Sequence, residues 1–301
     1  MARGLPFVDA HVHLWDLDRI AYPWLMPPFS DDGPNGSVEP IARTYLLDDY
    51  LADASGWDVR GIVHVDAGAA PEAALAETEW LQAMAETRGM PNAIIAFAAL
   101  DDPAVDAVLA AHARHPAVRG IRHIVNWHPD PRRSYTPRDV TQDDAWARGF
   151  ARLAHHGLSF DLQAYPGQFP GLARLLARHP EVAVMINHAG MAVPDEWDDW
   201  RAGMRALAAL PHVAVKISGM GFTHRPWGDA DGRSYVLETI ALFGPARVMF
   251  ASDFPTDKLF GSFAAHLDAY DRFTASFSDD ERRAMFAGNA NRLYRLGLDL
   301  P

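Results

Sequence analysis

The sequence contains no cysteine and only two lysines, Lys216 and Lys258, among its 301 residues. Without cysteine there is no disulfide framework, no thiolate ligand for a metal ion and no cysteine nucleophile. A chain of this composition fits a reducing compartment, so we expect a cytoplasmic protein.

Long apolar stretches are also missing. No run approaches the roughly 18 apolar residues that a membrane-spanning helix needs. The first ten residues, MARGLPFVDA, hold no apolar segment of the kind found in secretory signals. We therefore expect neither membrane insertion nor export.

Positive charge is scarce as well, and the formal net charge is −12. Proteins that bind nucleic acids gather Lys and Arg on one face. The nearest such group here, Arg132 and Arg133, is diluted by neighbouring Asp and Pro residues. The sequence thus argues against a nucleic-acid partner and favours a small-molecule substrate.

Short apolar runs alternate with segments of helical character along the whole chain. We expect strands at residues 7–9, 59–65, 93–98, 118–121, 159–163, 182–187, 213–217 and 248–251. Near-continuous apolar strands are typical of a parallel sheet that helices cover on its outer face. Eight strand-and-helix units in a chain of this length predict an α/β fold, the (β/α)8 or TIM barrel. No polar linker interrupts the middle of the chain, so we expect a single domain over residues 1–301.

Two long connections break the regular alternation, at residues 17–57 and 219–235. Both follow a predicted strand and are rich in Pro, Gly and aromatic residues, so we expect them to form loops at the barrel mouth. Near the C-terminus, Ser278 and Glu281 have the spacing of a capping box, which predicts closing helices.

Reactive side chains stand where the predicted strands end, which is where barrel enzymes carry their catalytic residues. These side chains are Asp9, His11, His13, Arg122, His123, Gln163, Tyr165, His188, Lys216, Ser218 and Asp253. Residues two apart in a strand point the same way, so His11 and His13 are expected to converge on the barrel axis. Two imidazoles placed side by side can bind a metal ion or polarise a carbonyl oxygen.

Nine segments in a fixed order carry a family resemblance over essentially the whole chain. They are DAHVHLWD with YPWL, VHVDAG with ETEWL, VRGIRHIV, NHAG, VKISG, SDFP and GNANRLYRL. In order and spacing they resemble the amidohydrolase superfamily, and within it the amidohydrolase-2 group, which includes sugar lactonases such as L-fuconolactonase and L-rhamnonolactonase.

The resemblance implies attack of water on an ester-like carbonyl. Asp253 would be the general base, with His188, His11 and His13 around the reacting oxygen. The residues expected to contact substrate are Arg122, His123, Lys216, Tyr165 and Trp24, of which Trp24 rests on the resemblance alone. Lys216 stands out because a lysine inside an apolar strand is unfavourable unless it is paired.

Two departures from the superfamily bear on the metal. The bridged two-metal centre of many members needs a lysine after the fourth strand, and neither lysine of this chain lies there. Gln163 also stands where metal-binding relatives usually supply a histidine. The metal question therefore stays open. Either one divalent ion, Zn²⁺ or Mn²⁺, is held by His11, His13, Asp253 and His188, or the site is metal-independent and Arg122, Lys216 and the histidines stabilise the oxyanion.

The leading functional prediction is a hydrolase that opens a lactone, with the lactone of a sugar acid in carbohydrate metabolism as the expected substrate. The loop after the fourth strand reads RHIVNWHPDP, whereas lactonase relatives often carry an acidic pair in it. This difference leaves open that the substrate is not the usual sugar lactone. A metal-dependent decarboxylase of a small aromatic or unsaturated acid competes with this prediction, as does a non-catalytic barrel that binds a small molecule. A homodimer, formed through an apolar helix face or residues 17–57, is also left open.

Overall fold

The computed structural model describes residues 4–191, 193–223 and 229–301. Eight strands, paired parallel and in chain order, form one sheet. Their bounds are β1 Pro6–Val12, β2 Asp58–Val65, β3 Ala93–Phe97, β4 Val118–Arg122, β5 Ser159–Leu162, β6 Val184–Ile186, β7 Val213–Ile217 and β8 Val248–Phe250. The predicted barrel is confirmed, although β1 runs three residues further than the sequence indicated.

The sheet closes into a nearly complete barrel through the residues that follow β8. Val12 and Phe254 form a single parallel bridge. The His13 N–H donates to the Phe254 carbonyl oxygen at 2.8 Å, and the Asp253 N–H donates to the His11 carbonyl oxygen at 2.9 Å. The end of β1 and the segment after β8 are therefore fixed side by side at the mouth.

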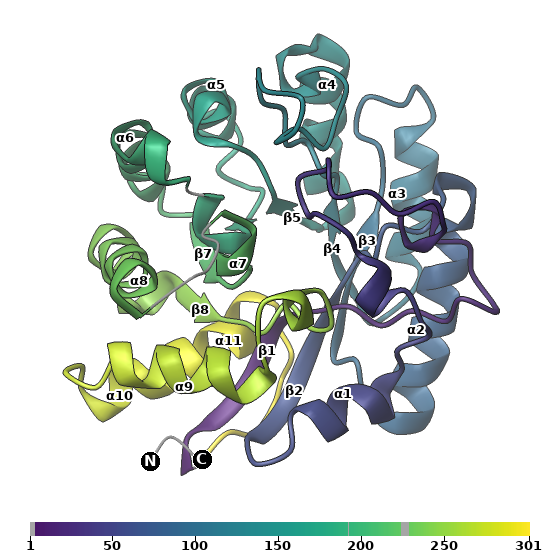
Figure 1. The fold of residues 1–301 in the computed structure, drawn as a ribbon. Helices are drawn as coiled ribbons and strands as arrows, with labels where there is room; N and C mark the ends of the chain where they lie inside the picture. The colour runs from purple at the N-terminus through teal and green to yellow at the C-terminus, as the bar shows by residue number, and fades with distance from the viewer. Residues whose placement is uncertain (1–3, 192, 224–228) are drawn as a thin grey trace.

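Helices surround the strands as an outer ring (Figure 1). Those described are α1 Leu47–Asp53, α2 Ala74–Arg88, α3 Val105–Ala113, α4 Asp144–Arg152, α5 Phe169–Leu176, α6 Trp197–Ala208, α7 Met220–Thr223, α8 Asp229–Phe243, α9 Phe263–Phe273, α10 Asp279–Arg283 and α11 Asn289–Leu293. The predicted capping box is confirmed, because the Glu281 N–H donates to the Ser278 hydroxyl and the Ser278 N–H donates to the Glu281 carboxylate. A π-helical turn, Ala284–Gly288, joins α10 to α11.

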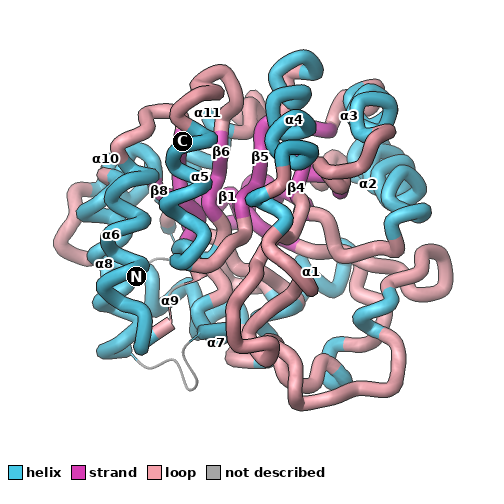
Figure 2. The backbone as a smooth tube through the Cα atoms, turned by 90° about the horizontal axis from the view of Figure 1, so that it is seen from above, coloured by secondary structure: helices cyan, strands magenta, loops and turns pink. Residues whose placement is uncertain are grey.

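Beyond the carboxyl ends of the strands, long loops form a broad layer on the same side as α7 (Figure 2). The first predicted loop, residues 17–57, is interrupted by α1. The second, residues 219–235, is largely helical where it is described, because α7 and the start of α8 fall within it. Trp227, one of the aromatic residues in this second loop, lies outside the described residues.

An apolar cluster that includes Val8, Val63, Ile95 and Met185 fills part of the inside of the barrel. Tyr294, which follows α11, packs into the same cluster. Polar and charged side chains occupy the barrel interior towards the mouth. In the described ranges, no helix combines the length and the apolar character needed to cross a membrane.

Close packing of α4 gives a test of the fold. A Cβ on Gly149 would lie 1.8 Å from the Leu100 backbone oxygen, so the helix approaches that loop too closely for any side chain. We expect Gly149→Ala to lower the free energy of unfolding by about 1–3 kcal/mol, measured by urea denaturation. Gly288→Ala is the matched control, since Gly288 has helical φ and ψ of −61° and −39° and its nearest neighbour would be 3.7 Å away. The control should be neutral or slightly stabilising, and equal stability of the two variants would contradict the close approach.

Candidate active site

Three side-chain atoms from the two adjoining segments meet at one point. The Nε2 atoms of His11 and His13 are 3.2 Å apart. Oδ1 of Asp253 lies 3.4 Å from Nε2 of His11 and 3.2 Å from Nε2 of His13. The structure thus brings together the pair predicted from the β1 alternation and the aspartate predicted after β8.

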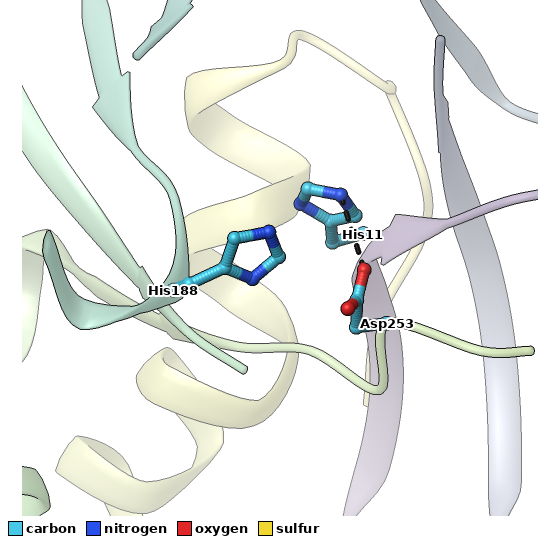
Figure 3. A group of neighbouring side chains, drawn as sticks. All are labelled: His11, His188 and Asp253. Carbon is cyan, nitrogen blue, oxygen red and sulfur yellow. Dashed lines mark ion pairs between the residues drawn. The ribbon is translucent and has the colours of Figure 1, made fainter. Parts of the chain in front are cut away.

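His188 approaches the same point from the end of β6. Its ring centroid is 4.8 Å from that of His11, and its Nδ1 lies 3.0 Å from the Ser218 hydroxyl. Figure 3 shows His188 facing His11 and Asp253, with the three side chains arriving from different segments of the chain. All four predicted catalytic residues therefore lie together.

The backbone at two of these residues is strained. His188 has φ of 53° and Asp253 has φ of 56°, a left-handed conformation that non-glycine residues adopt at some cost. Such strain concentrates at functional sites, where the surrounding structure holds it in place. Asp9 supports the segment that carries Asp253. Its Oδ1 accepts the N–H of the neighbouring Ser252 at 2.9 Å, and its Oδ2 accepts the Tyr50 hydroxyl at 2.9 Å.

Hydrogen bonding and burial fix the charge state of the cluster. Nδ1 of His13 lies 2.8 Å from the Val65 carbonyl oxygen, which can only accept, so this nitrogen carries the proton and Nε2 presents a lone pair. Burial lowers the pKa of His13 to about 3 and the pKa of His188 to about 4, so both rings are neutral near pH 7. Burial also raises the pKa of Asp253 to about 6, although His188, Arg122 and Lys216 oppose that shift.

The donor set fits a divalent metal ion. Ligand atoms about 2.1 Å from a tetrahedral Zn²⁺ lie roughly 3.4 Å from one another, close to the spacing of the His11, His13 and Asp253 atoms. His11, His188 and Asp253 also offer ligand atoms within 4.8 Å of one another. A backbone carbonyl that holds the second nitrogen of a histidine, as Val65 holds His13, is the usual support of a metal-binding imidazole.

A cavity of about 230 Å³ opens above this cluster. Its polar lining includes His13, His188, Asp253, Arg122 and Gln163, and its apolar lining includes Trp24, Ile124 and Phe222. A few convergent polar groups within an apolar wall are typical of a small-molecule site.

Arg122, at the end of β4, is held rigidly on the cavity wall. Its Nε donates to Oδ2 of Asp66 at 3.1 Å, and its guanidinium also donates to the Asp66 backbone oxygen. A third N–H donates to Oε1 of Gln163 at 3.2 Å. Gln163 therefore orients the Arg122 guanidinium. The sequence pattern did not single out Asp66, although it follows β2 as the other site residues follow their strands.

Of the predicted substrate-contact residues, some line the cavity and others do not. Trp24 lines the cavity, and its Nε1 donates to the Ala67 carbonyl oxygen at 2.8 Å. His123 and Tyr165 are not among the described lining residues. Nδ1 of His123 accepts N–H groups from Leu100 and Trp146, both at 3.2 Å. The Tyr165 hydroxyl donates to the Arg133 carbonyl oxygen at 2.6 Å.

Lys216 is fully buried inside the barrel, and it too is absent from the described lining of the cavity. Its ammonium group donates to Oδ2 of Asp161. The Tyr294 hydroxyl donates to the same carboxylate, at 3.0 Å from Oδ1. This pairing satisfies the buried charge, so the inward lysine that the sequence singled out is accounted for by an internal ion pair.

Comparison with known proteins gives similarity over nearly the whole chain. The family model described as "Amidohydrolase" matches residues 8–296. The uncharacterized protein y4mH of Sinorhizobium fredii is 40% identical over 299 residues, which cover 97% of this chain and 99% of that protein. An L-fucono-1,5-lactonase of Burkholderia multivorans is 30% identical over 309 residues, which cover 96% of both.

Solved structures agree with the architecture. The crystal structure of an amidohydrolase from Burkholderia multivorans with bound Zn matches with a TM-score of 0.79 and 28% identity, covering 98% of this chain and 99% of the other. A 2,6-dihydroxybenzoate decarboxylase from Rhizobium matches with a TM-score of 0.69 and 15% identity, covering 97% and 99% of the two chains. At that identity the decarboxylase shares the fold, and nothing about its reaction carries over.

Proposed function

The chain belongs to the amidohydrolase family, as its motifs predicted, and from this premise we propose that it is a lactonase that opens the lactone of a sugar acid with water. Similarity to an L-fucono-1,5-lactonase supports a lactone as the substrate class. The observation that carries the proposal is the convergence of the Asp253 carboxylate and neutral imidazoles at the floor of a cavity with a fixed guanidinium on its wall.

In the proposed reaction, Asp253 takes a proton from water while the water oxygen forms a bond to the lactone carbonyl carbon. A pKa raised to about 6 leaves Asp253 ionised near pH 7 and more basic than an exposed aspartate. The tetrahedral intermediate then collapses, and the bond between the carbonyl carbon and the ring oxygen breaks. Asp253 returns its proton to the leaving ring oxygen, so the product is a hydroxy acid and the carboxylate is regenerated.

The other site residues position the attacking water and stabilise the charge that develops in the reaction. Arg122 keeps N–H groups beyond those given to Asp66 and Gln163, and it lines the cavity into which the carbonyl oxygen would project. We assign it the stabilisation of the negative charge that develops on that oxygen. His188, held by Ser218, lies across from His11 and limits where the attacking water can sit.

A test of this function is a pH-indicator assay with aldono-1,4- and aldono-1,5-lactones, run with and without a chelator. Acid release that depends on the protein would support the proposal. If no lactone is hydrolysed even after addition of Zn²⁺ or Mn²⁺, the proposal falls.

We propose that a divalent ion, when bound, is held by His11, His13 and Asp253 with His188 nearby. When bound there, such an ion would polarise a carbonyl oxygen and would lower the pKa of a water molecule to about 7. We expect about one Zn²⁺ per chain after incubation with zinc and removal of excess, measured by elemental analysis. The double variant His11→Gln/His13→Gln should retain little zinc. His156→Gln, which alters a histidine paired with Asp106 at the surface, is the control.

Two outcomes would count against this assignment. Equal zinc in the double variant and the wild type would place the ion elsewhere. A wild-type protein that hydrolyses lactones without zinc or manganese would favour the metal-independent site, in which Arg122 and the histidines stabilise the oxyanion.

Arg122→Met tests the role of the guanidinium. We expect kcat for lactone hydrolysis to fall by about 10²–10³, the usual effect of losing one oxyanion donor, with a smaller change in KM. The control is Arg132→Met, because Arg132 is largely exposed and pairs only with Asp130 among the described residues. A wild-type kcat in the Arg122 variant would remove Arg122 from the mechanism.

A further inference from the structure

A second cavity, of about 300 Å³, adjoins the catalytic one. Trp24, Asn35 and Tyr135 line both cavities. These three side chains are therefore the boundary between the catalytic cavity and what we call the outer pocket, which lies between residues 28–38 and the loop that follows β4.

The boundary is rigid on one side. The Trp24 indole donates to Ala67 and stands edge-on to Trp15, with ring centroids 5.5 Å apart. It also packs against Gly68, where a Cβ would come within 2.8 Å of the indole nitrogen and where φ is +75°. Trp24 is thus fixed as a wall that both cavities share.

The other side of the boundary contains a hydrogen bond between two loops. The Tyr135 hydroxyl donates to Oδ1 of Asn35. Asn35 belongs to the long loop after β1, whereas Tyr135 is anchored to the β4 loop through its N–H, which donates to the Asn126 carbonyl oxygen at 3.0 Å. A hydroxyl group on a ligand can replace either partner of such a neutral bond, because it both donates and accepts.

The lining of the outer pocket indicates what it would hold. Its described residues include Phe29, Pro34, Ser30 and Ser134, and none of them is charged. The nearby carboxylates of Asp31 and Asp32 are tied into the same loop, by Ser37 and Ser30. Their negative charge disfavours an anionic group, while aromatic and hydroxyl side chains suit a neutral, hydroxylated one.

Resting on the proposed lactonase function, we infer that the outer pocket is a subsite for the exocyclic polyol chain of the lactone, and that Asn35 and Tyr135 recognise its hydroxyl groups. The ring would lie over Asp253 in the catalytic cavity, and the chain would pass between Asn35 and Tyr135 along the face of Trp24. Lactones with longer neutral chains are then the better substrates.

The test compares 1,4-lactones of tetronic, pentonic, hexonic and heptonic acids, which carry no, one, two or three exocyclic carbons. We expect kcat/KM to rise about tenfold or more across the series, since six further non-hydrogen atoms gain contacts. Gly33→Trp should abolish this rise. Gly33 lines the outer pocket but not the catalytic cavity, and a Cβ added there would meet open space.

Turnover of the tetronic lactone by Gly33→Trp at the wild-type rate reports a folded active site. Gly4→Trp, also into open space, is the matched control and should keep the rise. A flat series in the wild type, or an unchanged rise in Gly33→Trp, would overturn the outer subsite while leaving the lactonase function standing. Failure of every lactone would overturn the lactonase function and the subsite with it.

Discussion

Replacement of Asp253 by asparagine is expected to lower kcat/KM for lactone hydrolysis by about 10²–10⁴, the range attributed to a positioned general base. Asparagine has nearly the shape of aspartate and can keep the backbone contacts to His11, but its amide cannot take a proton from water. The loss should appear mainly in kcat, measured as acid release by the pH-indicator assay, because the lining of the cavity is otherwise unchanged.

A matched control exists four residues further along the chain. Asp257 is also fully buried, and burial together with the neighbouring Asp253 carboxylate raises its pKa well above the usual range, which favours the neutral acid. Asparagine imitates a neutral carboxylic acid, and Asp257 does not line the catalytic cavity among its described residues. We expect Asp257→Asn to retain most of the activity.

The pair of variants separates the competing functions. If Asp253→Asn is as active as Asp257→Asn, the general-base role of Asp253 is wrong. If neither the wild type nor Asp253→Asn turns over any lactone, but both bind the same small molecule equally well, the non-catalytic barrel is the better interpretation.

Much of the fold could be predicted because the governing signals are local. Each strand is a short apolar run flanked by a helical segment, and this repeated pattern is enough to indicate the barrel. The ends of elements were less predictable. β1 extends to Val12 because Val12 pairs with His64 of β2 and with Phe254 after β8, and α7 forms inside a stretch whose glycines indicated a loop. Both depend on tertiary contacts that a local pattern does not contain.

The catalytic cluster could be located for a similar reason. Strand alternation determines that His11 and His13 point to the same side, and the barrel brings all carboxyl strand ends to one mouth. Alternation does not determine how deep a side chain lies or what it pairs with. Lys216 was expected at the substrate because it points inward, yet its depth places it against Asp161. Asn35 and Tyr135 were missed because their contact joins two loops a hundred residues apart.

The pair formed by Lys216 and Asp161 leads to the second large expected effect, which is on stability. Both side chains have no exposed surface. Lys216→Met would leave the Asp161 carboxylate buried with the Tyr294 hydroxyl as its remaining partner among the described side chains. Breaking a buried pair in this way lowers the free energy of unfolding by about 3–5 kcal/mol, which urea denaturation would measure.

Two further variants make this result specific to the buried charge. Lys258→Met removes the chain's other lysine, which is 28% exposed and pairs with Asp53 at 2.6 Å, and it should cost no more than about 1 kcal/mol. The double variant Lys216→Met/Asp161→Leu removes both charges at once. It should recover most of the lost stability, because an apolar pair of similar volume can replace a buried ion pair. If Lys216→Met costs no more than Lys258→Met, Asp161 is not held as a buried charge. If the double variant is no more stable than the single one, the loss comes from packing around Tyr294 and not from the unpaired carboxylate.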